Sequence, residues 1–258
     1  MPTWTRPHFQ TSNKLADVAI VVYTSLGLDG LSASVSRHGV PDDTARFPFR
    51  LDHYTRTDSP LLFTELKDDS LLSLAKDEGL NIDVIKRVEH QILLRLKLPD
   101  PKDCNHLRVG WGLVRAICDA TTVHGVLDLH AQRWWTLERL RDTAPDGEME
   151  IRNEVSTALL PSNHPTFARV RHSRGLRKFA RPDLVLPNLT LPQALEADEV
   201  LYSLARYMAK GANLTPGQPI VVGGFRGTAE PYVANVNAPM IALNNRALVV
   251  MPEGRTQL

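Results

Sequence analysis

Cysteine is scarce in this chain, and no apolar run is long enough to cross a bilayer. The 258 residues contain two cysteines, Cys104 and Cys118, whose spacing fits neither a CxxC redox motif nor a zinc site. The longest apolar stretch, residues 15–28, is shorter than the roughly 20 residues of a transmembrane helix and contains Asp17. The first residues lack the charged start and apolar core of a signal peptide. We therefore expect a cytoplasmic protein with no membrane partner.

An excess of charge of one sign is also missing. Lysine and arginine number 30 and aspartate and glutamate 29, which gives a formal net charge of +1. Dedicated nucleic-acid-binding proteins are normally basic, so we do not expect a nucleic-acid partner. The 43% hydrophobic content is ordinary for a globular protein.

Complete catalytic and cofactor motifs are absent as well. The sequence has no Gly-x-Ser-x-Gly elbow and no His-Glu-x-x-His zinc motif. The run Gly223-Gly-Phe-Arg-Gly-Thr228 lacks the Gly-Lys-Ser/Thr ending of a phosphate-binding loop, and it reads as a tight turn or bulge. We expect no cofactor and no metal, and the sequence favours a non-enzyme.

Apolar patterning predicts an α+β fold with helices packed on a mainly antiparallel sheet. A break at residues 142–147 suggests an N-terminal lobe, 1–144, and a C-terminal lobe, 145–258, although a single compact domain remains open. Predicted helices cover residues 69–76, 82–96, 131–141 and 191–210. Predicted strands cover residues 16–23, 47–51, 107–118, 124–130, 150–159, 167–174, 183–189 and 219–223, with a hairpin over 240–250.

The helix over residues 191–210 has the clearest signals. Thr190 and Gln193 form a capping box at its start, and Lys210-Gly211 marks its end. Its predicted buried stripe consists of Leu201, Leu204, Ala205 and Met208. The helix over residues 82–96 is predicted from Asn81 as its cap and from one apolar face: Ile82, Ile85, Val88, Ile92 and Leu96.

Residues 169–181 carry six cations and no acid: Arg169, Arg171, Arg174, Arg177, Lys178 and Arg181. Arginine forks suit carboxylates and phosphates, so an anion- or partner-binding surface is one reading. The other reading is a solvated strand face whose cations pair with acids elsewhere, such as Glu196, Asp198 and Glu199.

Pro182 should turn the chain and bring Asp183 back toward His172 and Arg174. A carboxylate there would raise the pKa of His172 and orient the arginine. Such a cluster would either hold neighbouring strands together, which we call a strand clamp, or bind an anionic ligand, which we call an anion seat. We predict His172, Arg174, Arg177 and Asp183 as binding residues.

The segment before residue 136 contains two further groups of candidate functional side chains. Trp134 and Trp135 cannot both face the core of a helix, so one is predicted at an edge or binding surface. His124, Asp128 and His130 share one strand face, but His124 lies too far along the strand to bind the same metal ion as the others. Asp128 and His130 remain a two-ligand fragment, which is too few to hold an ion.

Two segments resemble signatures of bacterial proteins known only as domains of unknown function. They are Asp119-Ala-Thr-Thr-Val-His-Gly-Val-Leu-Asp128, closed by Gln132-Arg-Trp-Trp, and His172-Ser-Arg-Gly-Leu-Arg-Lys-Phe-Ala-Arg-Pro-Asp-Leu184. The resemblance covers about residues 108–211 and implies strands before a long helix, with almost nothing about function. This chain departs at Thr121-Thr122 and at Ala180, where that family has glycine, so a tight turn there must be made differently.

Two classes of function remain. The first is a non-catalytic binding or adaptor protein that recognises a protein or an anionic ligand through the predicted binding residues. The second is a hydrolase or metal-assisted enzyme that uses Asp128, His130 and His172. The first is preferred because every enzyme motif is incomplete.

Overall fold

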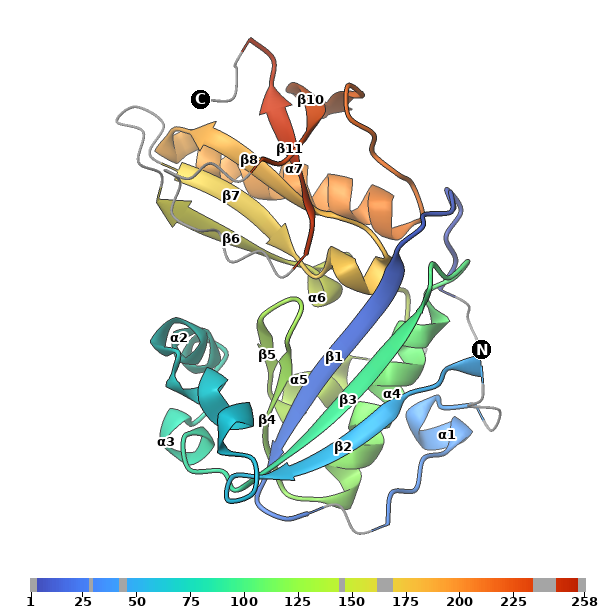
Figure 1. Ribbon diagram of the computed structural model, residues 1–258, viewed down its shortest axis with the longest axis vertical. Helices are drawn as coiled ribbons and strands as arrows, with labels where there is room; N and C mark the ends of the chain where they lie inside the picture. The colour runs from blue at the N-terminus through green and yellow to red at the C-terminus, as the bar shows by residue number, and fades with distance from the viewer. Residues whose placement is uncertain are drawn as a thin grey trace. The chain divides into compact units, whose positions relative to one another are not determined.

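The computed structural model describes residues 4–27, 30–41, 46–143, 147–161, 169–233 and 245–254 (Figure 1). The chain divides into two compact units. The first comprises Met1–Thr5, Ala16–Leu98 and Asp103–Met149, and the second Arg6–Leu15, Pro99–Lys102 and Glu150–Leu258. The main change of unit thus lies close to the predicted division at residue 145, but two short early segments belong to the second unit.

The first unit contains a five-stranded sheet with the order β2-β3-β1-β4-β5. Its strands are β1 (Leu15–Thr24), β2 (Arg50–Thr55), β3 (His90–Pro99), β4 (Val123–Asp128) and β5 (Arg133–Trp135). The pairs β2–β3, β1–β4 and β4–β5 are antiparallel. Its helices are α1 (Val35–His38), η2 (Pro60–Lys67), α2 (Asp69–Asp77), α3 (Ile82–Ile85), α4 (Asn105–Ala120) and α5 (Leu137–Asp142).

The tryptophans of β5 show that both faces of this sheet are covered. Trp134 packs on Tyr23 with ring centroids 5.4 Å apart, and its indole Nε1 donates to the Leu71 carbonyl of α2 at 2.9 Å. Trp135 packs on Trp111 of α4 at 4.9 Å. Neighbouring strand residues point to opposite faces, so the two side chains are 0% and 1% exposed. This burial does not fit the predicted binding role, which assumed a helix at this point.

The second unit contains a six-stranded sheet with the order β6-β7-β8-β11-β10-β9. Its strands are β6 (Ser156–Pro161), β7 (Arg169–Arg174), β8 (Asp183–Leu189), β9 (Pro219–Val222), β10 (Phe225–Pro231) and β11 (Ala247–Pro252), and its helices are α6 (Ile151–Glu154), η3 (Leu176–Phe179) and α7 (Leu191–Ala209). All its neighbours pair antiparallel except β8 and β11, which are parallel. The predicted α+β class is confirmed.

Helix α7 packs against β7 and β8, as its sequence signals predicted. The backbone N–H of Thr190 donates to Gln193 Oε1 at 3.1 Å, which forms part of the capping box. At its end Gly211 has φ 106°, and a Cβ there would lie 2.5 Å from the backbone of Phe9, so only glycine fits. The predicted stripe is buried: Leu201, Leu204, Ala205 and Met208.

The predicted helix over residues 82–96 is wrong. Asn81 does cap α3, by accepting from the Val84 N–H at 3.2 Å, but this helix ends at Ile85. Strand β3 follows, with buried side chains at every second position: Ile92, Leu94 and Leu96. The buried residues 92, 94 and 96 have the two-residue period of a strand. The helix was predicted because the apolar residues 85, 88, 92 and 96 also fit a helical period.

Residues 107–118, predicted as a strand, lie inside α4. This helix is buried on nearly every side, and its residues Leu107, Val109, Trp111 and Leu113 also alternate with the two-residue period of a strand. Two glycines also weaken its helix propensity. At Gly112 a Cβ would lie 2.3 Å from the His38 carbonyl oxygen, so the close approach of α1 requires glycine.

Other boundaries differ less. The predicted helix over 131–141 is β5 followed by α5, and the predicted strand over 150–159 begins with α6. The predicted strand over 47–51 is instead β2, which starts at Arg50. The strands predicted at 16–23, 124–130, 183–189 and 219–223 are confirmed as β1, β4, β8 and β9. Parts of the predicted segments 167–174 and 240–250 lie outside the described residues.

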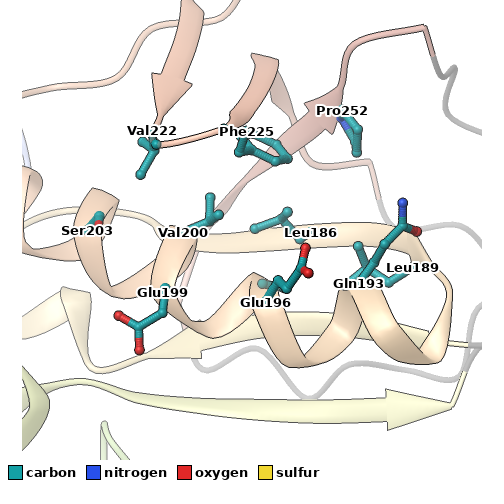
Figure 2. A pocket seen from close by; sticks show the side chains of 13 residues that line it. Leu186, Leu189, Gln193, Glu196, Glu199, Val200, Ser203, Val222, Phe225 and Pro252 are labelled. Atoms are coloured by element: carbon teal, nitrogen blue, oxygen red, sulfur yellow. The ribbon is translucent and has the colours of Figure 1, made fainter.

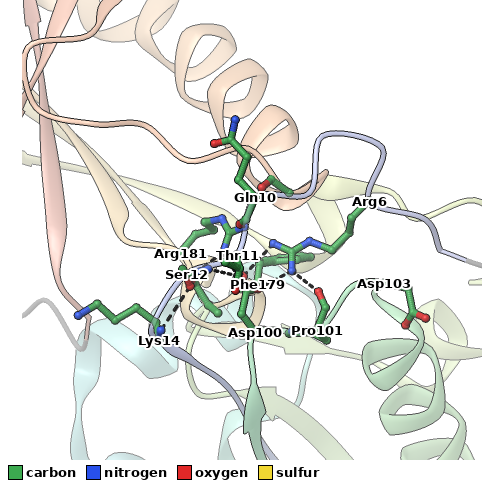
Figure 3. Close-up of polar contacts among 12 residues, drawn as sticks. Arg6, Gln10, Thr11, Ser12, Lys14, Asp100, Pro101, Asp103, Phe179 and Arg181 are labelled. Atoms are coloured by element: carbon green, nitrogen blue, oxygen red, sulfur yellow. Dashed lines mark hydrogen bonds and ion pairs between the residues drawn. The ribbon is translucent and has the colours of Figure 1, made fainter.

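A buried charge cluster holds the two early segments in the second unit (Figure 3). Arg6 Nη1 and Arg181 Nη1 lie 2.7 and 2.8 Å from the two carboxylate oxygens of Asp100. The three side chains are at most 1% exposed. Backbone carbonyls accept further guanidinium hydrogen bonds, among them those of Ala209 from Arg6 and Gly211 from Arg181. We call Arg6, Asp100 and Arg181 the arginine clasp.

Among the described helices, none is long and apolar enough to cross a membrane.

Candidate functional site

Several cations of the basic segment already have acidic partners. Arg171 forms an ion pair with Asp198 of α7. Lys178 Nζ lies 2.6 Å from Glu154 Oε2, and both side chains are buried. Arg181 belongs to the arginine clasp. These pairs support the reading in which the cations stabilise the fold, although Lys178 and Arg181 are buried rather than solvated.

Asp183 connects strand β7 to the turn that follows it. Its Oδ1 accepts from the Ser173 hydroxyl at 3.3 Å and from the Leu176 N–H at 3.2 Å. The Ser173 hydroxyl also lies 2.9 Å from the Leu184 backbone nitrogen, whose N–H donates to it. Asp183 is 1% exposed. Its contacts are those of a strand clamp.

His172 is fully buried on β7. Burial, together with the smaller effect of the nearby Arg174 charge, lowers its pKa to about 4. The predicted rise of this pKa through Asp183 is therefore wrong. Arg174 and Arg177 are partly buried and have interaction partners of their own. The contacts of Asp183 and the burial of His172 favour the strand clamp over the anion seat.

The predicted catalytic alternative is not assembled in either unit. Asp128 Oδ1 accepts from the backbone N–H groups of His130 and Ala131, both at 3.0 Å, and so closes the turn after β4. His130 Nε2 lies 3.3 Å from Asp17 Oδ1. His172 belongs to the second unit. Across the described ranges, no three His, Cys, Asp or Glu side chains are arranged to hold a metal ion.

An open groove of about 560 Å³ lies beside α7 in the second unit (Figure 2). The helix forms one wall, and the β9–β10 hairpin faces it across the groove. Strands β8 and β11 contribute the remaining surface. The apolar lining residues that Figure 2 labels are Leu186, Leu189, Val200, Val222, Phe225 and Pro252.

A two-residue turn shapes the hairpin wall of this groove. Val222 pairs with Phe225 across Gly223 and Gly224, which confirms the tight turn predicted there. Gly223 has φ 55°, a conformation that favours glycine. A Cβ on either glycine would meet no atom within 4 Å, so the tip of the hairpin leaves room for a ligand.

The polar lining of the groove is acidic. Glu196 and Glu199 lie on α7 together with Gln193 and Ser203, and the described lining contains no lysine, arginine or histidine. Glu199 forms an exposed ion pair with Arg152 at 2.6 Å. Glu196 is exposed and has no ion-pair partner among the described residues. Its charge is thus available to a ligand.

The comparisons with known proteins identify no relative. No protein-family model matches the chain, and neither a curated protein nor a solved structure shows significant similarity to it.

Proposed function

We propose that this protein is a binding protein of the cytoplasm, and that it holds a segment of a partner protein in the groove beside α7. The segment carries large apolar side chains flanked by lysine or arginine. The supporting observation is the combination of an apolar lining with Glu196 and Glu199 and no lining cation. Two free cysteines are compatible with a reducing compartment.

The volume of the groove and the charge of its lining contribute to recognition in different ways. The groove volume falls within the roughly 300–1,000 Å³ of typical binding sites. Apolar side chains gain affinity by leaving water, at about 25 cal/mol per Å² buried. The glutamates add selection by charge, since like charges at an interface are unfavourable. They disfavour the anionic ligand that the sequence also suggested.

Fluorescence anisotropy with two labelled 12-residue peptides tests this proposal on the whole chain. One peptide alternates leucine with lysine, and the other alternates leucine with glutamate. We expect saturable binding of the lysine peptide and at least about tenfold weaker binding of the glutamate peptide, a difference of about 1.4 kcal/mol. Glu196→Lys should remove most of this preference, and Val200→Asp should weaken both peptides.

Matched variants control for non-specific effects. Asp77→Lys makes the same charge change at an exposed position of α2. Leu195→Asp places an acid on α7 at a side chain that is 70% exposed and lies outside the groove lining. Both should bind like the parent protein. Equal binding by all variants would overturn the proposal. Binding of dodecylammonium without binding of either peptide would also overturn it. So would a dimer of the parent protein that Val200→Asp dissociates.

A further inference from the structure

A serine and a histidine form a polar pair at the surface of the first unit, independent of the groove. Ser25 directly follows β1, and His124 lies in β4, 99 positions later. The Ser25 Oγ is in hydrogen-bond contact with His124 Nε2. A hydroxyl in contact with an imidazole nitrogen is the arrangement in which histidine can remove the proton of an attacking serine.

A β-bulge directs His124 toward Ser25. Along the β1–β4 pairing, Tyr23 lies opposite Gly125, but Thr24 lies opposite Val123. His124 is therefore an extra residue without a partner in the ladder. Bulges re-aim side chains at strand ends and are frequent beside active sites.

Three hydrogen bonds hold the backbone around Ser25. Its own N–H donates to the Thr122 carbonyl at 3.0 Å. The hydroxyls of Thr24 and Thr121 donate to the Leu26 carbonyl at 2.7 and 3.2 Å. The serine is thus fixed on both sides, which preorganises the pair.

The pair opens onto a hollow of about 280 Å³. Val84 and Val88 supply apolar surface, and Arg87 and Glu89 supply charge. Arg87 Nε donates to the Asp83 carbonyl at 2.8 Å, and its Nη groups make no hydrogen bond with the described residues. Those Nη groups are donors available to a negatively charged oxygen. A short acyl group fits this volume.

Neither cysteine competes as the nucleophile. Burial raises the pKa of the Cys118 thiol to about 12, and Cys104 is fully buried. With this pKa, the Cys118 thiol is not a thiolate at neutral pH.

We propose that Ser25 and His124 form a nucleophile–base pair that hydrolyses small carboxylic esters. Ser25 Oγ attacks the carbonyl carbon while its proton passes to His124 Nε2, and Arg87 stabilises the oxyanion. The tetrahedral intermediate collapses, and the alkoxide leaves with the proton from His124. Water then attacks the acyl-serine, with His124 taking and returning its proton, so that a carboxylic acid and an alcohol are released.

A fluorophosphonate probe and 4-nitrophenyl acetate test this proposal on the whole chain. We expect the probe to label Ser25, as located by peptide mass spectrometry. Ser25→Ala should abolish labelling and ester turnover, and His124→Gln should reduce both by about 100-fold or more. Arg87→Gln should lower kcat with little change in KM.

Ser73→Ala, at an exposed serine of α2, is the matched control and should leave labelling and turnover unchanged. Leu195→Asp, at an exposed position of α7 outside the groove lining, should also leave both unchanged. No labelling of Ser25, or turnover that survives Ser25→Ala, would overturn the proposal. If Ser25→Ala and His124→Gln lower the melting temperature and the parent protein is not labelled, the pair is only structural.

Discussion

At the residue scale, Ala180 shows how surrounding contacts can impose an unfavourable backbone. It has φ 57° in the turn between η3 and β8, a left-handed conformation that costs a non-glycine residue about 1–2 kcal/mol. Its N–H donates to the Arg177 carbonyl, and the Arg181 N–H donates to the Leu176 carbonyl, both at 3.1 Å. Ala180 therefore holds this left-handed turn without glycine, and the cost is offset by its neighbours.

His172 should make stability depend on pH. The residue has a pKa of about 4 when folded and an ordinary pKa of 6.5 when unfolded. The unfolded state therefore binds the proton first, and stability falls as the pH drops from about 6.5 to about 4. The full loss is roughly 3 kcal/mol. At pH 7 the side chain is neutral in both states and contributes no such loss.

Urea unfolding between pH 4 and 7.5 measures this effect. His172→Phe should flatten the dependence, and His8→Phe, at an exposed histidine, should leave it unchanged. An unchanged slope in His172→Phe would show that other groups cause the loss.

At the element scale, a helix or strand was predicted more accurately when more independent sequence signals agreed on it. For α7 the cap, the period and the stop agreed, so its bounds were predicted to within a residue. For α4 residues 107–113 also alternate as in a strand, and for β3 the apolar residues satisfied two periods at once. Local sequence cannot resolve such cases, because tertiary packing decides them.

The groove was missed for a related reason. Its α7 wall, β8 and the Gly223-Gly224 turn were each predicted, but their convergence depends on the parallel pairing of β8 with β11, which no local pattern encodes. Ser25 and His124 are likewise joined only by the register of β1 and β4. The acids of α7 were noted solely as partners for the basic segment.

Leu204→Ala tests the packing of α7 on its sheet. The side chain is 4% exposed, so its truncation should cost about 2–5 kcal/mol in urea unfolding. Leu195→Ala, at a 70% exposed position of the same helix, should change stability by less than about 0.5 kcal/mol. Equal effects of the two substitutions would contradict the observed orientation of the helix.

At the scale of the whole molecule, the second unit is discontinuous in sequence. The break near residue 145 was predictable from turn-forming residues, but the membership of residues 6–15 and 99–102 was not. Their place depends on the arginine clasp, in which residues from three distant parts of the chain share buried charge. Such long-range ion pairs carry no signature in the sequence.

Asp100→Asn should therefore destabilise the protein strongly. It removes a carboxylate in contact with both clasp arginines, whose side chains are fully buried, and loss of one partner of a buried ion pair costs about 3–5 kcal/mol. Glu199→Gln breaks the exposed pair with Arg152 and should cost no more than about 1 kcal/mol. Thermal and urea unfolding of both variants measure the difference. Similar losses would show that the clasp contributes no more than a surface pair.

The arginine clasp also sets an order of events during synthesis. Arg6 is synthesised before the Ala209 carbonyl that it binds, which follows 203 residues later. At about 5–20 residues per second, a ribosome needs roughly 10–40 s to supply it. Through this interval the first strands can pair, while the guanidinium of Arg6 stays hydrated and the segment around it stays unfolded. The second unit can close only after translation has passed α7, so it completes its folding after the whole of the first unit has been synthesised.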